Sequence, residues 1–142
     1  MTNFKPIGEG FFIGPQPTAN ELSEAKKQGI QTVIDFRLPS ETPTSNASLV
    51  RESGLNYVNI PVDKTALAEH QIGELSTALK ENAAPFLLHC ATGARAAMLL
   101  ALVRARQNIW TAQRTFDEAS AMGFNLQTSP EFTAFVTNSS QK

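Results

Sequence analysis

The sequence predicts a single α/β domain, with a central, mostly parallel sheet of about four or five strands flanked by helices. Three observations support this. Short apolar runs alternate with segments of helical periodicity, as is typical of a parallel sheet covered by helices. The chain has 142 residues, which suits one domain with a sizeable core. No repeat or linker divides it, so we expect residues 1–142 to form one unit.

Turn residues and capping signals define the predicted elements in the first half of the chain. Gly14 and Pro15 close the first apolar run. Thr18 and Glu21 have the spacing of a capping box that opens a helix, and Gly29 ends that helix. The expected elements are an edge strand or strand start at 11–13, a helix from 18 to 29, a buried strand at 32–36, a loop at 37–46, a helix near 46–53 and a strand at 57–60.

Helical periodicity dominates the second half of the chain. Ile72, Leu75 and Leu79 fall on one helical face, and Pro85 separates their helix from the next apolar run. A segment rich in Ala, Leu and Arg then predicts a largely buried helix, and Thr111 can cap the helix that follows. The expected elements are a helix at about 67–81, a strand at 86–89, and helices at 95–107, from 111 to 123 and near 130–138.

Composition argues against several classes of function. The net charge of −1 gives no general attraction for nucleic acid or anionic membranes, and no segment approaches the length of a membrane span. The first residues contain no apolar run of signal-peptide length, and the one cysteine forms neither an internal disulfide nor a thiolate zinc cage. We therefore expect a cytoplasmic protein with no metal, no cofactor and no nucleic-acid or membrane partner; the sequence defines no oligomeric state.

Trp110 suits a packing role, whereas Arg104, Arg106 and Arg114 are expected to form a solvated helix face.

The stretch FLLHCATGARAAM, residues 86–98, places Cys90 between a predicted strand and a predicted helix. Ligands of parallel sheets bind at the carboxyl ends of the strands, which is where Cys90 lies. Gly93 can adopt a positive φ that turns the loop amides toward an anion, and Arg95 can pair with two oxygens of a phosphate-like group. The same field favours a thiolate, so Cys90 is a candidate nucleophile. The alternative is a buried structural thiol beside a tight turn.

The chain resembles cysteine-dependent phosphatases of the dual-specificity type, and more closely the phosphatase-like family of the bacterial beta-lactamase hydrolase-like proteins. The segments that carry the resemblance are FFIGPQPTANEL, GIQTVIDFRLPSE, GLNYVNIPVD, FLLHCATGARAAM and AQRTFDEASAMGF. The resemblance implies a protein tyrosine phosphatase-like fold, with Cys90 as the nucleophile and Arg95 as the phosphate-binding arginine. It further implies that His89 orders the loop from behind and that Gly93 is the loop glycine. Asp63 falls where such phosphatases place their general acid.

Residues around the predicted anion site have less specific signals. Ala91, Thr92, Gly93 and Ala94 make up the loop and are expected to surround the bound group. Arg37 follows the strand at 32–36 and is expected on the same edge of the sheet; it either lines the pocket or forms a surface ion pair with Glu41. Asp35 ends that strand and is expected to be a hydrogen-bonded structural residue. Asp63 has the alternative role of capping a turn after Pro61.

Two positions depart from the phosphatase pattern and keep other functions open. Four residues separate Cys90 from Arg95, whereas the phosphatase signature has five; four is the spacing of single-domain rhodaneses, which carry a persulfide on the loop cysteine. Ala96 stands where phosphatases usually carry a Ser or Thr that helps the thiolate leave. The main hypothesis is a phosphatase that hydrolyses phosphomonoesters through a phosphocysteine on Cys90 and acts on a phosphate-bearing small molecule or a phosphoprotein. The alternatives are a rhodanese-like sulfurtransferase with a Cys90 persulfide and a non-catalytic anion-binding regulatory module.

Overall fold

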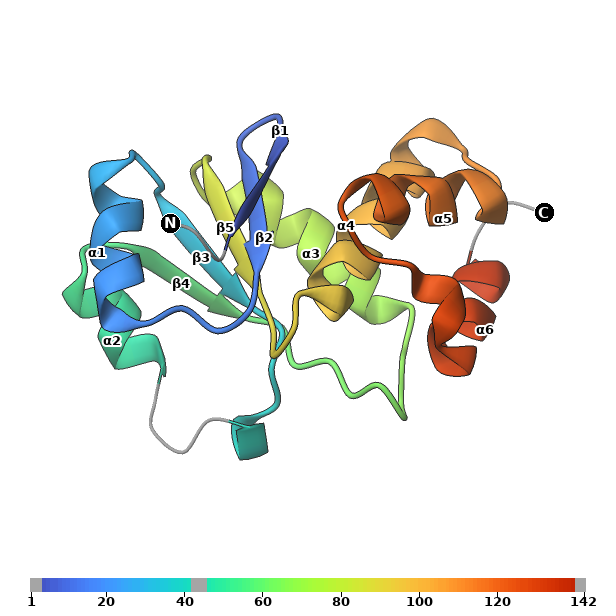
Figure 1. The fold of residues 1–142 in the computed structure, drawn as a ribbon, viewed down its shortest axis with the longest axis horizontal. Helices are drawn as coiled ribbons and strands as arrows, with labels where there is room; N and C mark the ends of the chain where they lie inside the picture. Colours follow the sequence, from blue (N-terminus) through green and yellow to red (C-terminus); the bar gives the residue numbers. More distant parts are fainter. Residues whose placement is uncertain (1–3, 42–45, 140–142) are drawn as a thin grey trace.

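The computed structural model describes residues 4–41 and 46–139, and its centre is a sheet of five strands in the order β1-β2-β5-β3-β4 (Figure 1). The strands are β1 (Lys5–Gly8), β2 (Phe11–Gly14), β3 (Thr32–Asp35), β4 (Asn56–Asn59) and β5 (Phe86–His89). β2, β5, β3 and β4 run parallel, and β1 pairs antiparallel with β2. These pairings confirm the predicted single-domain, mostly parallel sheet and put β5 at its middle.

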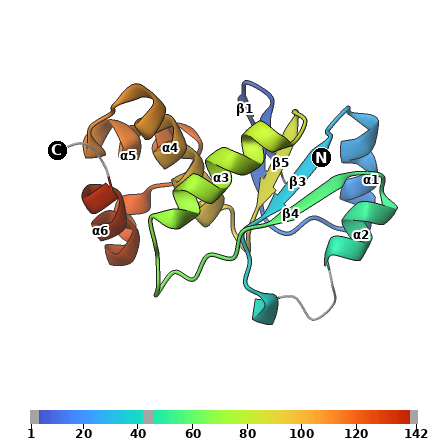
Figure 2. The ribbon, with the colours of Figure 1, turned by 180° about the vertical axis from the view of Figure 1, so that it is seen from behind.

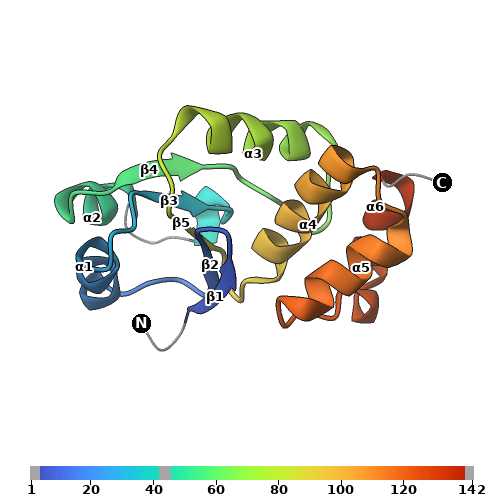
Figure 3. The same ribbon diagram turned by 90° about the horizontal axis from the view of Figure 1, so that it is seen from above.

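Helices cover both faces of this sheet, as Figures 2 and 3 show. α1 and α2 lie on one face, α3 and α4 lie on the other, and α5 and α6 pack outside α4. The helices are α1 (Ala19–Lys27), α2 (Asn46–Glu52), α3 (His70–Glu81), α4 (Ala94–Asn108), α5 (Ala112–Ala121) and α6 (Pro130–Ser139), with short 3-10 turns at Pro39–Glu41 and Leu126–Thr128.

Alternation of side chains along the central strands divides the core between the two faces. Val33 and Leu87 belong to the cluster under α1 and α2, whereas Ile34 and Leu88 belong to the larger cluster under α3 and α4. Successive strand residues point to opposite faces of a sheet, so a strand buried on both sides is a continuous apolar run. For this reason the sequence alone predicts the central strands.

The edge strand β1 was not predicted, and it is the main difference from the expected fold. Because β1 pairs with β2, residues 11–13 belong to an inner strand and not to the edge. Its residues, KPIG, contain no apolar run, and both Pro and Gly are disfavoured in the interior of a sheet. They are tolerated because β1 is an edge strand with a register irregularity between Pro6 and Gly8. The other strands and helices occur where expected, within a few residues at their ends; α3, for example, begins at His70 rather than near residue 67. Of the predicted 37–46 loop, residues 42–45 lie outside the described residues.

No helix among the described residues is both long enough and apolar enough to cross a membrane.

Candidate active site

The loop after β5 places Cys90 at the carboxyl edge of the sheet, against the first turn of α4. Cys90 is buried, and its Sγ accepts a hydrogen bond from the N–H of Gly93 at 3.0 Å. α4 begins at Ala94, so its free amide hydrogens and the positive end of its dipole lie beside the sulfur. Amide hydrogens at a helix N-terminus are placed to donate hydrogen bonds to a bound anion.

Gly93 is required at its position for two independent reasons. Its φ is +104°, a conformation that L side chains rarely adopt. A Cβ at this position would also lie 2.6 Å from Cζ of Phe124, a residue near the other end of the chain. The tight loop therefore depends both on the missing side chain and on the aromatic ring packed against it.

Arg95 is held by a carboxylate and a carbonyl group from two other loops. Its Nη1 donates to Oε2 of Glu41 at 2.8 Å and to the Val62 carbonyl at 2.8 Å, and its Nη2 donates to Oε1 of Glu41 at 2.7 Å. A guanidinium has five N–H donors, so the Nε hydrogen and one Nη2 hydrogen remain for an anion or for the Cys90 sulfur. The hydrogen bond to Glu41 raises the pKa of Arg95, and the nearby Cys90 raises it further. The guanidinium of Arg95 is thus held in place, and the edge that carries the Nε hydrogen and the second Nη2 hydrogen can bind an anion.

Arg37 lies behind the loop and is not among the residues that line the surface hollow at the site. It is 2 % exposed and forms a two-point ion pair with Asp35, with Nε to Oδ1 and Nη2 to Oδ2 both at 3.0 Å. The expected alternative, a surface ion pair between Arg37 and Glu41, is wrong, because Asp35 pairs with Arg37 inside the protein and Glu41 pairs with Arg95. A substrate contact by Arg37 remains a prediction.

His89 lies with this ion pair in a buried polar layer beneath the loop. Its side chain is fully buried, and its Nδ1 lies 3.8 Å from Oδ1 of Asp35. Burial lowers the pKa of His89 to about 4, against the opposing effect of Asp35, so the imidazole is neutral at pH 7. Burial alone would raise the pKa of Asp35, but hydrogen bonds from Arg37 and the positive charge that His89 carries when it is protonated at low pH bring it below its ordinary value. Tyr57 also donates to Asp35, at 3.0 Å.

Asp63 and Arg95 both line the site. The carboxyl group of Asp63 is ionised at neutral pH, which is the state of a base and not that of a proton donor. Its Oδ1 accepts hydrogen bonds from the Thr65 hydroxyl at 2.7 Å and from the Thr65 N–H at 2.9 Å. These bonds lower the pKa of Asp63, and Arg95 adds to the effect. Asp63 therefore stabilises a turn, which is one of its two predicted roles, and it lines the hollow at the site; its role as a general acid stays a prediction.

An open hollow of about 390 Å³ lies in front of the loop. The expected residues on its wall are Asp63, Ala91, Thr92, Ala94 and Arg95; the residues that sequence reasoning did not assign to the site are Leu38, Glu41, Lys64 and Phe132. The sequence could have placed Glu41 at the site, because this residue follows a strand whose end was expected there. It could not have placed Phe132 there, because only the packing of α6 in the folded protein brings this residue to the hollow.

No group of three or more His, Cys, Asp or Glu side chains that could hold a metal ion occurs among residues 4–41 and 46–139. The polar side chains on the wall of the hollow are the Arg95 guanidinium, the Lys64 ammonium, the Thr92 hydroxyl and two carboxylates. The buried Cys90 precedes Ala91, a wall residue, but is not itself on the wall.

Residues 3–107 match the sequence model of a family described as the phosphatase-like domain of beta-lactamase hydrolase-like proteins. The chain belongs to this family. A beta-lactamase hydrolase-like protein of Xylella fastidiosa (strain Temecula1) is 29 % identical to it over 122 residues. That match covers 82 % of this chain and 27 % of the relative, so this chain spans little more than a quarter of the relative's length.

Solved structures share the fold of this phosphatase-like domain. The crystal structure of a candidate phosphatase from Neisseria meningitidis has a TM-score of 0.79 at 23 % identity, over 98 % of this chain and 99 % of that one. The catalytic core of the PP-IP phosphatase SIW14 from S. cerevisiae, solved with citrate, has a TM-score of 0.72 at 20 % identity, over 94 % and 83 % of the two chains. The predicted family and the predicted protein tyrosine phosphatase-like fold are both confirmed.

Proposed function

We propose that this domain is a cysteine-dependent phosphatase that hydrolyses phosphomonoesters through a phosphocysteine on Cys90. The observation that carries the proposal is the placing of Arg95. Glu41 and Val62 hold its guanidinium beside Cys90 while leaving an Nε and an Nη2 hydrogen for an anion. Membership of a phosphatase-like family supports the same chemistry.

In the proposed first step, the ester phosphate binds in front of Cys90. Its oxygens accept hydrogen bonds from Arg95 and from amides of the loop that includes Gly93 and Ala94. The Cys90 thiolate attacks phosphorus, the bond from phosphorus to the ester oxygen breaks, and the electron pair leaves with that oxygen. The loop and Arg95 act by stabilising the charge that develops on the phosphoryl oxygens.

Asp63 is the proposed proton donor to the leaving oxygen. In the free domain its pKa is low, so only a small fraction carries a proton at neutral pH. A bound phosphate brings negative charge next to Asp63, which raises the pKa of a carboxyl group. We expect Asp63 to act efficiently only in the substrate complex, and most visibly with alcohols that are poor leaving groups.

In the second step, water attacks the phosphorus of the phosphocysteine and gives a proton to the Asp63 carboxylate that the first step left. The bond from phosphorus to sulfur breaks, its electron pair stays on sulfur, and inorganic phosphate and the Cys90 thiolate are released. Ala96 offers no hydroxyl to the departing sulfur, so we expect this step to limit turnover. The substrate is a phosphate-bearing small molecule or a phosphoprotein. Leu38, Phe132 and Lys64 on the wall of the hollow would contact the part of the substrate beyond its phosphate.

A sulfurtransferase is the second candidate, and two observations favour it. The spacing from Cys90 to Arg95 is one residue shorter than in the phosphatase signature, and Ala96 lacks the hydroxyl. Removing a residue shortens the contour of a loop by up to ~3.5 Å, so fewer amides can surround a tetrahedral anion. An anion-binding module with little catalysis is the third candidate.

Paired assays on wild type and Cys90→Ser distinguish the three. Release of phosphate from an aryl phosphate is measured at mildly acidic pH, and thiosulfate-to-cyanide transfer is measured at alkaline pH. We expect phosphate release that depends on Cys90, no sulfur transfer, and a phosphoprotein trapped by acid quenching of wild type alone. Sulfur transfer without phosphate release would replace the phosphatase by the sulfurtransferase, and loss of both activities would leave the binding module. Arg106→Gln, which alters an exposed side chain outside the hollow, is the matched control.

A further inference from the structure

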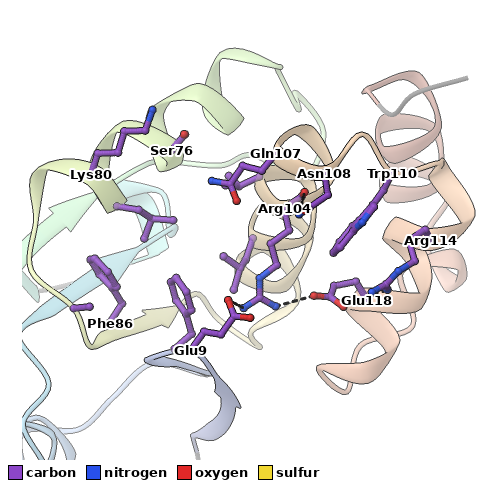
Figure 4. A pocket seen from close by; sticks show the side chains of 15 residues that line it. Glu9, Ser76, Lys80, Phe86, Arg104, Gln107, Asn108, Trp110, Arg114 and Glu118 are labelled. Carbon is purple, nitrogen blue, oxygen red and sulfur yellow. Dashed lines mark hydrogen bonds and ion pairs between the residues drawn. The ribbon is translucent and has the colours of Figure 1, made fainter.

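A second and larger cavity, of about 720 Å³, lies at the far end of α4 from the Cys90 loop (Figure 4). Its apolar part is formed by the stacked rings of Phe11 and Phe86, with centroids 5.6 Å apart, and by side chains of α3 and α4. Trp110 closes the side toward α5. The volume lies within the range of about 300–1,000 Å³ typical of small-molecule sites.

Arg104 lies within this cavity, which corrects the expectation that it belongs to a solvated helix face. Its side chain is 14 % exposed, and its guanidinium lies over the Phe11 ring, 5.5 Å from the centroid. Nη1 donates to Oε2 of Glu118 at 2.8 Å. Nη2 is buried and has no hydrogen-bond partner among the described residues. A buried charged donor without a partner costs free energy, so this atom marks a place where an acceptor would bind.

A carboxylate with an exposed side chain lies close to this donor. Oε2 of Glu9 lies 3.7 Å from Nη2 of Arg104, beyond hydrogen-bond distance, and the Glu9 side chain is 81 % exposed. The cavity lining contains three cations, Lys80, Arg104 and Arg114, against two carboxylates, Glu9 and Glu118, and so carries one excess positive charge. Lys80 has no ion pair within the described part of the chain. The charge balance therefore favours an anionic ligand.

We infer that this cavity binds a small amphipathic carboxylate. The ligand's carboxylate takes the place of Glu9 at Nη2 of Arg104, where it completes a charge-assisted hydrogen bond. Its aromatic or aliphatic body covers the apolar part formed by Phe11, Phe86 and their neighbours. This site is independent of the proposed phosphatase chemistry.

The test is a titration with 2-naphthoate, which is followed by the fluorescence of Trp110, the only tryptophan in the chain, and by equilibrium dialysis. The uncharged 2-naphthylmethanol is the matched ligand control. We expect 2-naphthoate to bind at least ~10-fold more tightly than the alcohol, and Arg104→Gln to abolish most of that difference. Glu9→Gln removes the competing carboxylate and should tighten binding several-fold. Arg106→Gln, on the same helix but outside this cavity, should leave binding unchanged.

Three outcomes would overturn the proposal. Equal binding of the acid and the alcohol would show that no cation recognises the carboxylate. Weaker binding in Glu9→Gln would show that Glu9 supports the ligand instead of competing with it. Loss of binding in Arg95→Ala, or displacement by inorganic phosphate, would place the ligand in the Cys90 hollow. If Arg104→Gln fails to fold, Glu9→Gln and Lys80→Gln decide the matter, because both alter exposed side chains; the proposal then requires tighter binding in the first and weaker binding in the second.

Discussion

Glu41 and Arg95 form a two-point ion pair, with Nη1 to Oε2 at 2.8 Å and Nη2 to Oε1 at 2.7 Å, although they lie 54 positions apart in the chain. The pair connects the loop after β3 to the first turn of α4. Its carboxylate sets the orientation of the guanidinium but leaves one edge of it available. Glu41 is thus a positioning residue for the proposed anion site.

Glu41→Gln is expected to lower kcat/KM for an aryl phosphate about tenfold. The amide keeps one acceptor oxygen but loses the charge and the second acceptor, so Arg95 loses its fixed orientation. The affinity for inorganic phosphate as a competitive inhibitor should fall by a similar factor. Glu74→Gln, on an exposed face of α3, serves as the control. Unchanged phosphate affinity together with a lower melting temperature would mean that Glu41 has only a structural role.

Ala96→Ser is expected to raise the steady-state turnover number several-fold if breakdown of the phosphocysteine limits the rate. Ala96 is fully buried beside Arg95, and a serine adds only one hydroxyl oxygen there. That hydroxyl could donate a hydrogen bond to the departing sulfur. Rapid-quench kinetics check this, because the wild-type burst of alcohol release should shrink in the variant. A burst of equal size in both proteins would contradict this prediction.

Thr65→Val tests the protonation of Asp63. The substitution removes the hydroxyl donor at 2.7 Å but keeps the backbone donor at 2.9 Å, so the pKa of Asp63 should rise toward its ordinary value. A general acid must be protonated, and the alkaline limb of kcat/KM against pH should therefore move to higher pH. The profile is measured with a substrate that has a poor leaving group. Asp63→Asn should remove this limb altogether; a limb that survives there belongs to another group.

The lowered pKa of His89 makes the stability of the domain depend on pH. Its pKa is about 4 in the folded protein, against 6.5 for an unperturbed histidine, so the unfolded chain binds the extra proton first. The stabilising effect is complete above pH 6.5 and is lost as the pH falls toward 4. The free energy of unfolding should fall by up to about 3 kcal/mol across this window. Urea titrations at several pH values measure this slope, which His89→Gln should flatten and His70→Gln should preserve.

Gly93→Ala is expected to destabilise the domain by roughly 2–4 kcal/mol, because it combines backbone strain at φ +104° with a steric clash against Phe124. Phe124→Leu in the same chain should recover only the part due to the clash. Denaturant unfolding of the two single variants and the double variant separates these contributions. Full recovery in the double variant would show that the backbone conformation itself costs little.

The sequence predicted those elements that its local patterns define. The continuous apolar run of β5 and the Gly93 turn located the loop, because burial on both faces and a positive φ leave direct traces in the residues. The contents of the site were harder to predict. Arg37 and Glu41 were correctly placed near one sheet edge, but their partners, Asp35 and Arg95, depend on which side chain turns inward. Phe132 reaches the hollow only through the tertiary packing of α6, whereas Lys64 directly follows Asp63 in the chain.

The packing of Phe124 against Gly93 has a practical consequence for any shortened version of this protein. The family match ends at residue 107, which suggests a natural place to truncate the chain. A fragment cut there would lose the Phe124 ring that packs against the turn next to Cys90, and it would lose Phe132 from the wall of the hollow. The last quarter of the chain therefore contributes to the structure around Cys90, and an inactive 1–107 fragment would say nothing about the chemistry of Cys90.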